Sequence, residues 1–308
     1  MTPHYIFIIG VAKAGTTALA GWLVSNGLAT YAIPGVKEPG TYLRTASNFH
    51  PPAPPLPGQS PLLDATPGYF DNQRVVSRLP EHHTRVALCL RNPFERAWSD
   101  YRMKKLLARR ADGASQFIER LHQVAGATPP DAPDEWHRQR KEAVLHSVPR
   151  ASAHHVEAHF DAETSRLLEG SFLQRLAYET AFFQSRQVFP HQPVLRFSFY
   201  YHGLRMLLDR YQPEDVVVLT THSLSDPDRR AAMAVRLAGG ASAGPPLDSR
   251  FTLSDLEFDE PEPDFSDHAF DPLRSMFAYD LEHTLDLLSS RGVSTDLIDP
   301  AELHRHIG

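Results

Sequence analysis

Hydrophobic residues in this chain fall into short continuous runs and into stripes of helical spacing. The continuous runs predict buried strands at Tyr5–Ile9, Arg85–Leu90 and Val216–Thr220. The stripes predict helices through Leu19, Trp22 and Leu23, through Leu204, Leu207, Leu208 and Tyr211, and through Leu273, Phe277, Leu281, Leu285 and Leu288. A further helix over residues 94–107 follows the turn at Asn92-Pro93, with Asn92 as its cap. Strands that alternate with helices predict an α/β fold with a parallel sheet flanked by helices.

Two stretches depart from this alternation. Residues 51–57 form a proline-rich tract, for which we expect an exposed loop. Residues 108–193 are mostly helical in pattern and contain breakers, so we interpret them as an insertion that covers or shapes a binding site. We therefore predict a single domain over residues 1–308 with one helical insertion.

Composition narrows the class of protein. With 308 residues, 42% hydrophobic and 22% charged, the chain has the make-up of a globular protein. No segment approaches the ~20 apolar residues that cross a bilayer, and the opening apolar run is too short for a signal peptide. The single cysteine, Cys89, allows no internal disulfide, so we expect a cytoplasmic protein. A net charge of −6 disfavours a nucleic-acid binder, and nothing indicates the oligomeric state.

The first candidate for chemistry is the glycine loop Gly10–Gly15, which follows the first predicted strand. Backbone N–H groups at a helix start can surround an anion, and Lys13 adds a positive charge there. In the nucleoside-triphosphate loop the lysine follows the second glycine. Here Lys13 precedes Gly15, and Thr16 stands where that lysine would be. The order of residues disfavours the binding of ATP or GTP.

The second candidate lies at the end of the next long strand. Arg91 leaves the strand end, where open α/β sheets bind ligands, and its guanidinium group suits a phosphate. Ser99 follows eight residues later on the predicted helix, within reach of the same group. We expect Arg96 to be structural, paired with Glu95 or a neighbouring carboxylate.

These two motifs, in this order, resemble the sulfotransferases that use 3′-phosphoadenosine 5′-phosphosulfate (PAPS). The resemblance implies a P-loop-like α/β fold, PAPS as cosubstrate and no metal. It also implies a 5′-phosphosulfate site and a 3′-phosphate site, the latter at Arg91 and Ser99. The residues it implies for the 5′-phosphosulfate site are Lys13, Ala14, Gly15, Thr16 and Thr17.

A third segment, Lys37-Glu38-Pro39, resembles the corresponding segment of heparan-sulfate and related Golgi-type sulfotransferases. That resemblance implies Glu38 as the general base and Lys37 as its helper, with Lys13 stabilising the leaving phosphate. Cytosolic sulfotransferases use a histidine base, so His154 and His155 stay as rivals that would lie on the acceptor side. Residues 64–70 resemble a further segment of the family and imply Thr66 and Tyr69 as acceptor contacts.

Departures from the family pattern bear on the acceptor. The glycosaminoglycan-modifying enzymes carry a late Lys-Gly-Arg loop and a disulfide, and this chain has neither, although Arg250 is a candidate replacement. The departures favour a bacterial-type enzyme that acts on a small molecule or lipid, including a glycolipid, over one acting on a large glycan. Two alternatives stay open: a P-loop kinase or nucleotide hydrolase, and a non-catalytic nucleotide-binding protein.

Overall fold

The structure is a computed structural model. It describes residues 3–44, 50–109, 122–128, 150–187, 190, 192–240 and 258–307.

A single parallel sheet lies at the centre of the described residues, with strand order β2-β3-β1-β4-β5. The strands are β1 (Tyr5–Gly10), β2 (Thr30–Tyr31), β3 (Leu62–Asp64), β4 (Thr84–Leu90) and β5 (Val216–Thr220). Phe7 in β1 is aligned with Asp64 on one side and Val86 on the other. Every residue of β1 is buried, as expected for a strand covered on both faces. The three predicted strands and the parallel sheet are confirmed.

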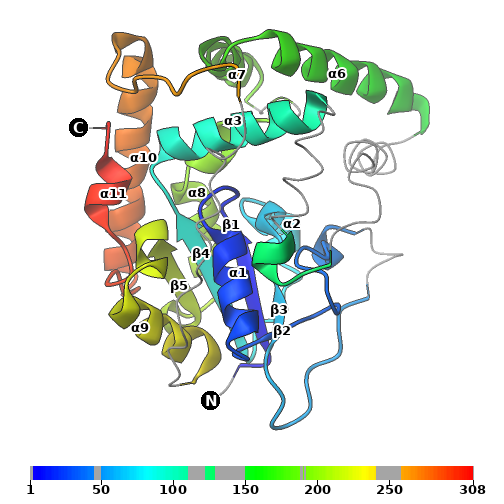
Figure 1. Cartoon of the computed structure of the whole chain (residues 1–308), viewed down its shortest axis with the longest axis vertical. Coiled ribbons are helices and arrows are strands. Elements are labelled where there is room, and N and C mark those ends of the chain that lie inside the picture. Colours follow the sequence, from blue (N-terminus) through cyan, green and yellow to red (C-terminus); the bar gives the residue numbers. More distant parts are fainter. Residues whose placement is uncertain are drawn as a thin grey trace.

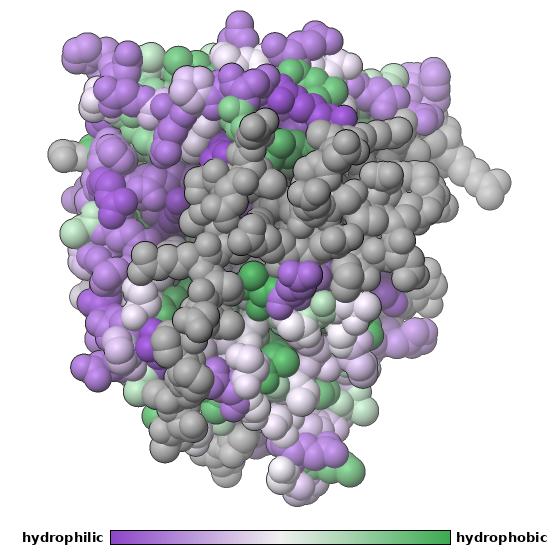
Figure 2. All heavy atoms as spheres, viewed as in Figure 1, coloured by the Kyte–Doolittle hydropathy of each residue, from purple (hydrophilic) through white to green (hydrophobic). Residues whose placement is uncertain are grey.

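Helices cover both faces of the sheet. They are α1 (Thr16–Ser25), α2 (Gln73–Val76), α3 (Pro93–Arg109), α6 (Arg150–Glu169), α7 (Phe172–Arg186), α8 (Tyr201–Leu208), α9 (Pro227–Ala238), α10 (Asp271–Ser290) and α11 (Pro300–His304). Figure 1 shows α1 in front of the sheet, α8 behind it, and α3 crossing above the end where β1 and β4 finish. Hydrophilic residues gather along the outer side of α10 and α11 (Figure 2), while the predicted apolar stripe of α10 packs inward.

The start of α3 follows the sequence prediction. The Asn92 side-chain oxygen accepts hydrogen bonds from the N–H groups of Phe94 (3.0 Å) and Glu95 (3.1 Å). Pro93 occupies the first turn, where its missing N–H costs nothing. The cap fixes the direction in which the chain leaves β4, directly beside Arg91.

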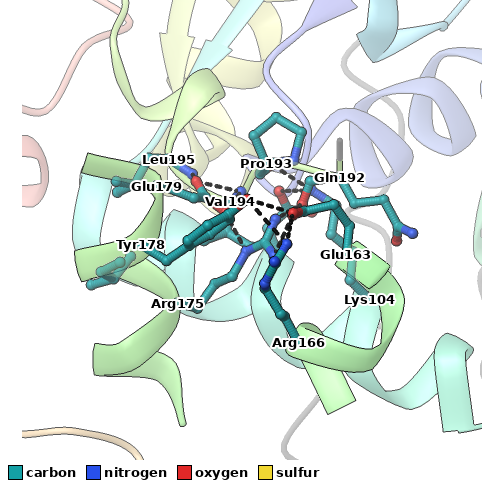
Figure 3. A network of polar contacts seen from close by, with 12 residues as sticks. Lys104, Glu163, Arg166, Arg175, Tyr178, Glu179, Gln192, Pro193, Val194 and Leu195 are labelled. Atoms are coloured by element: carbon teal, nitrogen blue, oxygen red, sulfur yellow. Dashed lines mark hydrogen bonds and ion pairs between the residues drawn. The ribbon is translucent and has the colours of Figure 1, made fainter. Parts of the chain in front are cut away.

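Helices α6 and α7 make up most of the described part of the predicted insertion. A buried ion network joins them to the chain that follows (Figure 3). Arg175 pairs with Glu163 (3.0 Å) and with Glu179 (2.6 Å). The Glu179 carboxylate also accepts the N–H groups of Val194 and Leu195, each at 2.8 Å. The network therefore fixes residues 194–195, which lie against α3 and the candidate site.

Candidate functional site

The glycine loop joins β1 to α1 at the carboxyl edge of the sheet. Lys13 and Gly15 both have positive φ angles, 72° and 88°, so the loop turns sharply before the helix. No side chain caps α1 at Gly15. The N–H groups of the first turn of a helix have no partner within it, and here they remain available to an anion.

The side chain of Lys13 lies among four other charged groups. Burial lowers its pKa to about 8, and the negative charge of Asp100 acts in the opposite direction. The positive charges of Arg91 and Lys37 contribute to this lowered value, whereas Glu38 acts against it. Residues from the three predicted motifs are thus close enough to influence one another's charge.

Arg91 occupies the gap between β4 and α3. Its guanidinium group donates to the Lys13 carbonyl oxygen over 3.3 Å and pairs with Glu95 over 3.2 Å. The hydroxyl group of Tyr200 donates to the Arg91 carbonyl oxygen over 2.6 Å, so Tyr200, which is fully buried, supports this backbone. Ser99 is partly buried on α3, one helical turn beyond Glu95 and therefore on the same side of the helix.

Arg96 is fully buried on α3, and its guanidinium group contacts the backbone of the glycine loop. It donates to the Ala12 carbonyl oxygen (3.3 Å) and the Ser198 hydroxyl group (2.7 Å), and it pairs with Asp100 (3.3 Å). Burial alone would raise the pKa of Asp100, but Lys104 and Arg96 hold it below its ordinary value. The structural role predicted for Arg96 agrees with these contacts, and its carboxylate partner is Asp100.

The Lys37-Glu38 pair lies on the segment that follows β2. Lys37 Nζ is 2.5 Å from Glu38 Oε1. The Lys37 side chain is only 8% exposed, whereas that of Glu38 is 51% exposed. The Lys37 carbonyl oxygen accepts the N–H group of Ala65 over 3.0 Å, which ties this segment to the end of β3. Glu38 can therefore meet a substrate while its partner stays fixed.

A buried carboxylate supports the same segment. Asp64 accepts hydrogen bonds from the hydroxyl groups of Thr66 (2.6 Å) and Tyr69 (2.7 Å). Those hydroxyl oxygens in turn accept the N–H groups of Gly40 and Tyr42, both at 3.2 Å. Burial raises the pKa of Asp64 to about 6, against the effect of its two donors.

This arrangement bears on two predicted site residues. The Thr66 and Tyr69 side chains are buried and their hydroxyl groups point inward to Asp64. In this structure both side chains position the backbone around Glu38, and their contact with an acceptor stays a prediction. The role of Asp64 was not foreseen, because an acid at the end of a three-residue strand carries no signal in the pattern of apolar positions.

The two rival histidines lie elsewhere. His154 and His155 are exposed on α6, with their ring centres 6.1 Å apart. Among the described residues, no hydrogen bond or ion pair joins either ring to the glycine loop or to Lys37-Glu38. Arg250 lies outside the described residues.

Two hollows of the described surface lie away from these residues. One, of about 360 Å³, is lined by α10 and the C-terminal segment, including Glu282 and Asp286. The other, of about 300 Å³, lies between α6 and α7 and is lined in part by Arg166 and Tyr178. Neither includes a residue of the three motifs.

The described residues contain neither a candidate metal site nor a candidate membrane span. None of their His, Cys, Asp and Glu side chains form a group of three or more that could hold a metal ion. Of the helices that the structure describes, none has both the length and the apolar character required to cross a membrane.

Comparison with known proteins gives a likeness in structure but none in sequence. No family model matches the chain, and no curated protein matches it. The fold is similar to that of a sulfotransferase from Alicyclobacillus acidocaldarius, with 18% sequence identity, a TM-score of 0.49, and coverage of 94% of this chain and 96% of that one. A likeness at this level leaves the activity to be argued from the residues of the chain itself.

Proposed function

We propose that this chain transfers a sulfuryl group from PAPS to a hydroxyl or amine group of an acceptor. One observation carries the proposal. The three motifs lie in mutual electrostatic contact at the carboxyl edge of the sheet, where Arg91 touches the Lys13 backbone and Glu38 acts on the Lys13 charge. This edge is where open α/β sheets bind ligands.

The residues present fit a nucleotide that carries a phosphate group at each end. The uncapped start of α1 and the Lys13 ammonium group suit the 5′-phosphosulfate. Arg91 and Ser99 suit the 3′-phosphate, since a guanidinium group binds phosphate with two parallel hydrogen bonds. The residues we assign to the 5′ end are Lys13, Ala14, Gly15, Thr16 and Thr17.

The reaction then needs a base and a cation. Glu38 accepts the proton of the acceptor hydroxyl or amine group as the acceptor atom bonds to sulfur. The bond between sulfur and the bridging oxygen breaks, and Lys13 stabilises the negative charge that develops on the leaving phosphate. Lys37 holds the Glu38 carboxylate in place over 2.5 Å. We propose no metal, because Lys13 supplies the positive charge.

The surroundings of Glu38 favour an acceptor with an apolar part. Ile33, Val36 and Leu43 are exposed apolar residues on the same short segment as Glu38. Exposed apolar side chains near a reactive group in the sequence give an apolar ligand groups to contact. We therefore propose a small molecule, lipid or glycolipid as the acceptor class.

Binding and transfer together test the proposal. Thermal-shift assays should show stabilisation by 3′-phosphoadenosine 5′-phosphate (PAP) without magnesium and none by ATP with magnesium. Transfer of ³⁵S from labelled PAPS should then be measured with a panel of phenols, alkyl alcohols and glycolipids. Stabilisation by ATP alone would favour a kinase or hydrolase, and PAP binding without transfer to any acceptor would favour a non-catalytic protein.

A further inference from the structure

Two arginines converge on one carboxylate beside the proposed 3′-phosphate site. Glu95 Oε2 lies 3.2 Å from Arg91 Nη2, and Glu95 Oε1 lies 2.9 Å from Arg305 Nη1. The Glu95 side chain is 15% exposed, whereas those of Arg91 and Arg305 are 30% and 56% exposed. Both guanidinium groups can therefore be reached from solvent.

The position of Arg305 is fixed by the fold, although it lies near the end of the chain. The Asn92 side-chain amide donates to the Leu303 carbonyl oxygen over 3.1 Å and also to that of Arg305. The side chain of Glu302, which precedes Leu303, accepts the N–H group of His222 over 2.9 Å. The Asn92 side chain thus caps α3 with its oxygen and binds the C-terminal segment with its nitrogen. These bonds bring Arg305 to the start of α3.

The charges at this place are unbalanced. Among the described residues, the Glu95 carboxylate pairs with two guanidinium groups, so a net positive charge remains in this cluster. An exposed ion pair contributes little to stability, so the pair with Glu95 gives Arg305 little weight in folding. A phosphate carries up to two negative charges and three acceptor oxygens, and it can bond to both guanidinium groups at once.

We propose that Arg305 binds the 3′-phosphate of the nucleotide together with Arg91, and that Glu95 competes with the phosphate, pairing with both guanidinium groups until the phosphate displaces it. The proposal rests on the proposed function, since it takes PAPS and PAP as ligands. It assigns Arg305 as a second phosphate-binding arginine, contributed by the C-terminal segment.

Calorimetric titration of the full chain tests this with two ligands, PAP and adenosine 5′-phosphate, which lacks the 3′-phosphate. Arg305→Ala should weaken PAP binding by about tenfold or more, because it removes hydrogen bonds to a charged group. Its affinity for adenosine 5′-phosphate should not change. Arg291→Ala is the matched control, because Arg291 is an exposed arginine paired with Asp209 over 2.8 Å, away from this site.

A second variant probes Glu95. Glu95→Gln removes a negative charge beside the incoming phosphate, so PAP should bind more tightly while adenosine 5′-phosphate binds as before. A loss of PAP affinity in Glu95→Gln would overturn the role given to this carboxylate.

The outcomes separate this inference from the proposed function. If Arg91→Ala weakens PAP binding but Arg305→Ala leaves it unchanged, Arg305 has no such role and the proposed function stands. Equal losses for both ligands in Arg305→Ala would also overturn the inference, because the effect would not depend on the 3′-phosphate. If PAP fails to bind the unmodified chain, both the inference and the proposed function fall.

Discussion

The Arg91 guanidinium group donates a hydrogen bond to the carbonyl oxygen of Lys13 over 3.3 Å. This bond joins the loop after β1 to the end of β4, two segments that are 78 residues apart. The two motifs that the sequence singles out for phosphate binding therefore meet at one edge of the sheet. On this account, Lys13 and Arg91 bind opposite ends of one nucleotide.

The lowered pKa of Lys13 makes nucleotide binding depend on pH. Burial brings the pKa to about 8 from 10.5, so Lys13 is charged at pH 7 and loses its proton as the pH rises through 8. A bound anion favours the charged form and raises the pKa again. PAP affinity should therefore fall above pH 8, and binding at pH 8.5 should take up protons, which titration in buffers of different ionisation enthalpy measures.

The variant Lys13→Met is the control for this pH dependence. It should bind PAP weakly and without the decline above pH 8. A decline of the same size in Lys13→Met would assign the titration to another group.

Glu38→Gln should separate chemistry from binding. The amide cannot accept the acceptor proton, so transfer of labelled sulfate should fall by about 100-fold or more, the usual contribution of a general base. PAP affinity should stay near that of the unmodified chain. Glu214→Gln, at an exposed position away from the site, is the matched control. A near-normal rate in Glu38→Gln would remove Glu38 from the mechanism and return His154 and His155 to consideration.

Removal of a buried hydrogen bond to Asp64 should lower the free energy of unfolding. Tyr69→Phe keeps the ring but leaves the buried Tyr42 N–H group without its acceptor and Asp64 without one donor. The free energy of unfolding should fall by about 1–3 kcal/mol, the cost of an unsatisfied buried group, as measured by urea denaturation. Tyr279→Phe, at an exposed tyrosine, should have no comparable effect. Equal stabilities for the two variants would contradict this account.

Replacement of Arg96 should lower the free energy of unfolding more than replacement of an exposed arginine. Arg96→Met leaves Asp100 with one cationic partner fewer in a buried site and frees the Ala12 carbonyl oxygen. We expect a loss of about 3–5 kcal/mol, as for other broken buried ion pairs. Arg236→Met, which breaks an exposed pair with Asp296, should cost far less in the same denaturation experiment. Similar losses in both would show that the buried network is not what holds the loop.

The sequence predicted the parts of the fold that have a clear local pattern. The buried runs of β1, β4 and β5, the cap at Asn92 and the stripe of α10 were all visible in it. Strands β2 and β3 were not, since two and three residues are too short to show a period. Their pairing with the sheet is decided by tertiary contacts.

Within the candidate site, too, only the residues that stand in a local sequence motif could be predicted. Lys13, Glu38 and Arg91 stand in recognisable local motifs. The partners of Asp64 and Arg305 could not be predicted, because those contacts join segments that only the fold brings together. The Arg305 to Glu95 pair, for example, spans 210 residues.

Titration of single variants with half-ligands shows whether Lys13 and Arg91 bind opposite ends of one nucleotide. Adenosine 5′-phosphosulfate carries only the 5′ group, and adenosine 3′-phosphate carries only the 3′ group. Lys13→Ala should weaken binding of the first ligand and Arg91→Ala that of the second, each by about tenfold or more, while both variants weaken PAP binding. If Arg91→Ala leaves PAP and adenosine 3′-phosphate binding unchanged, or if both variants weaken both half-ligands equally, Lys13 and Arg91 do not bind opposite ends of one nucleotide.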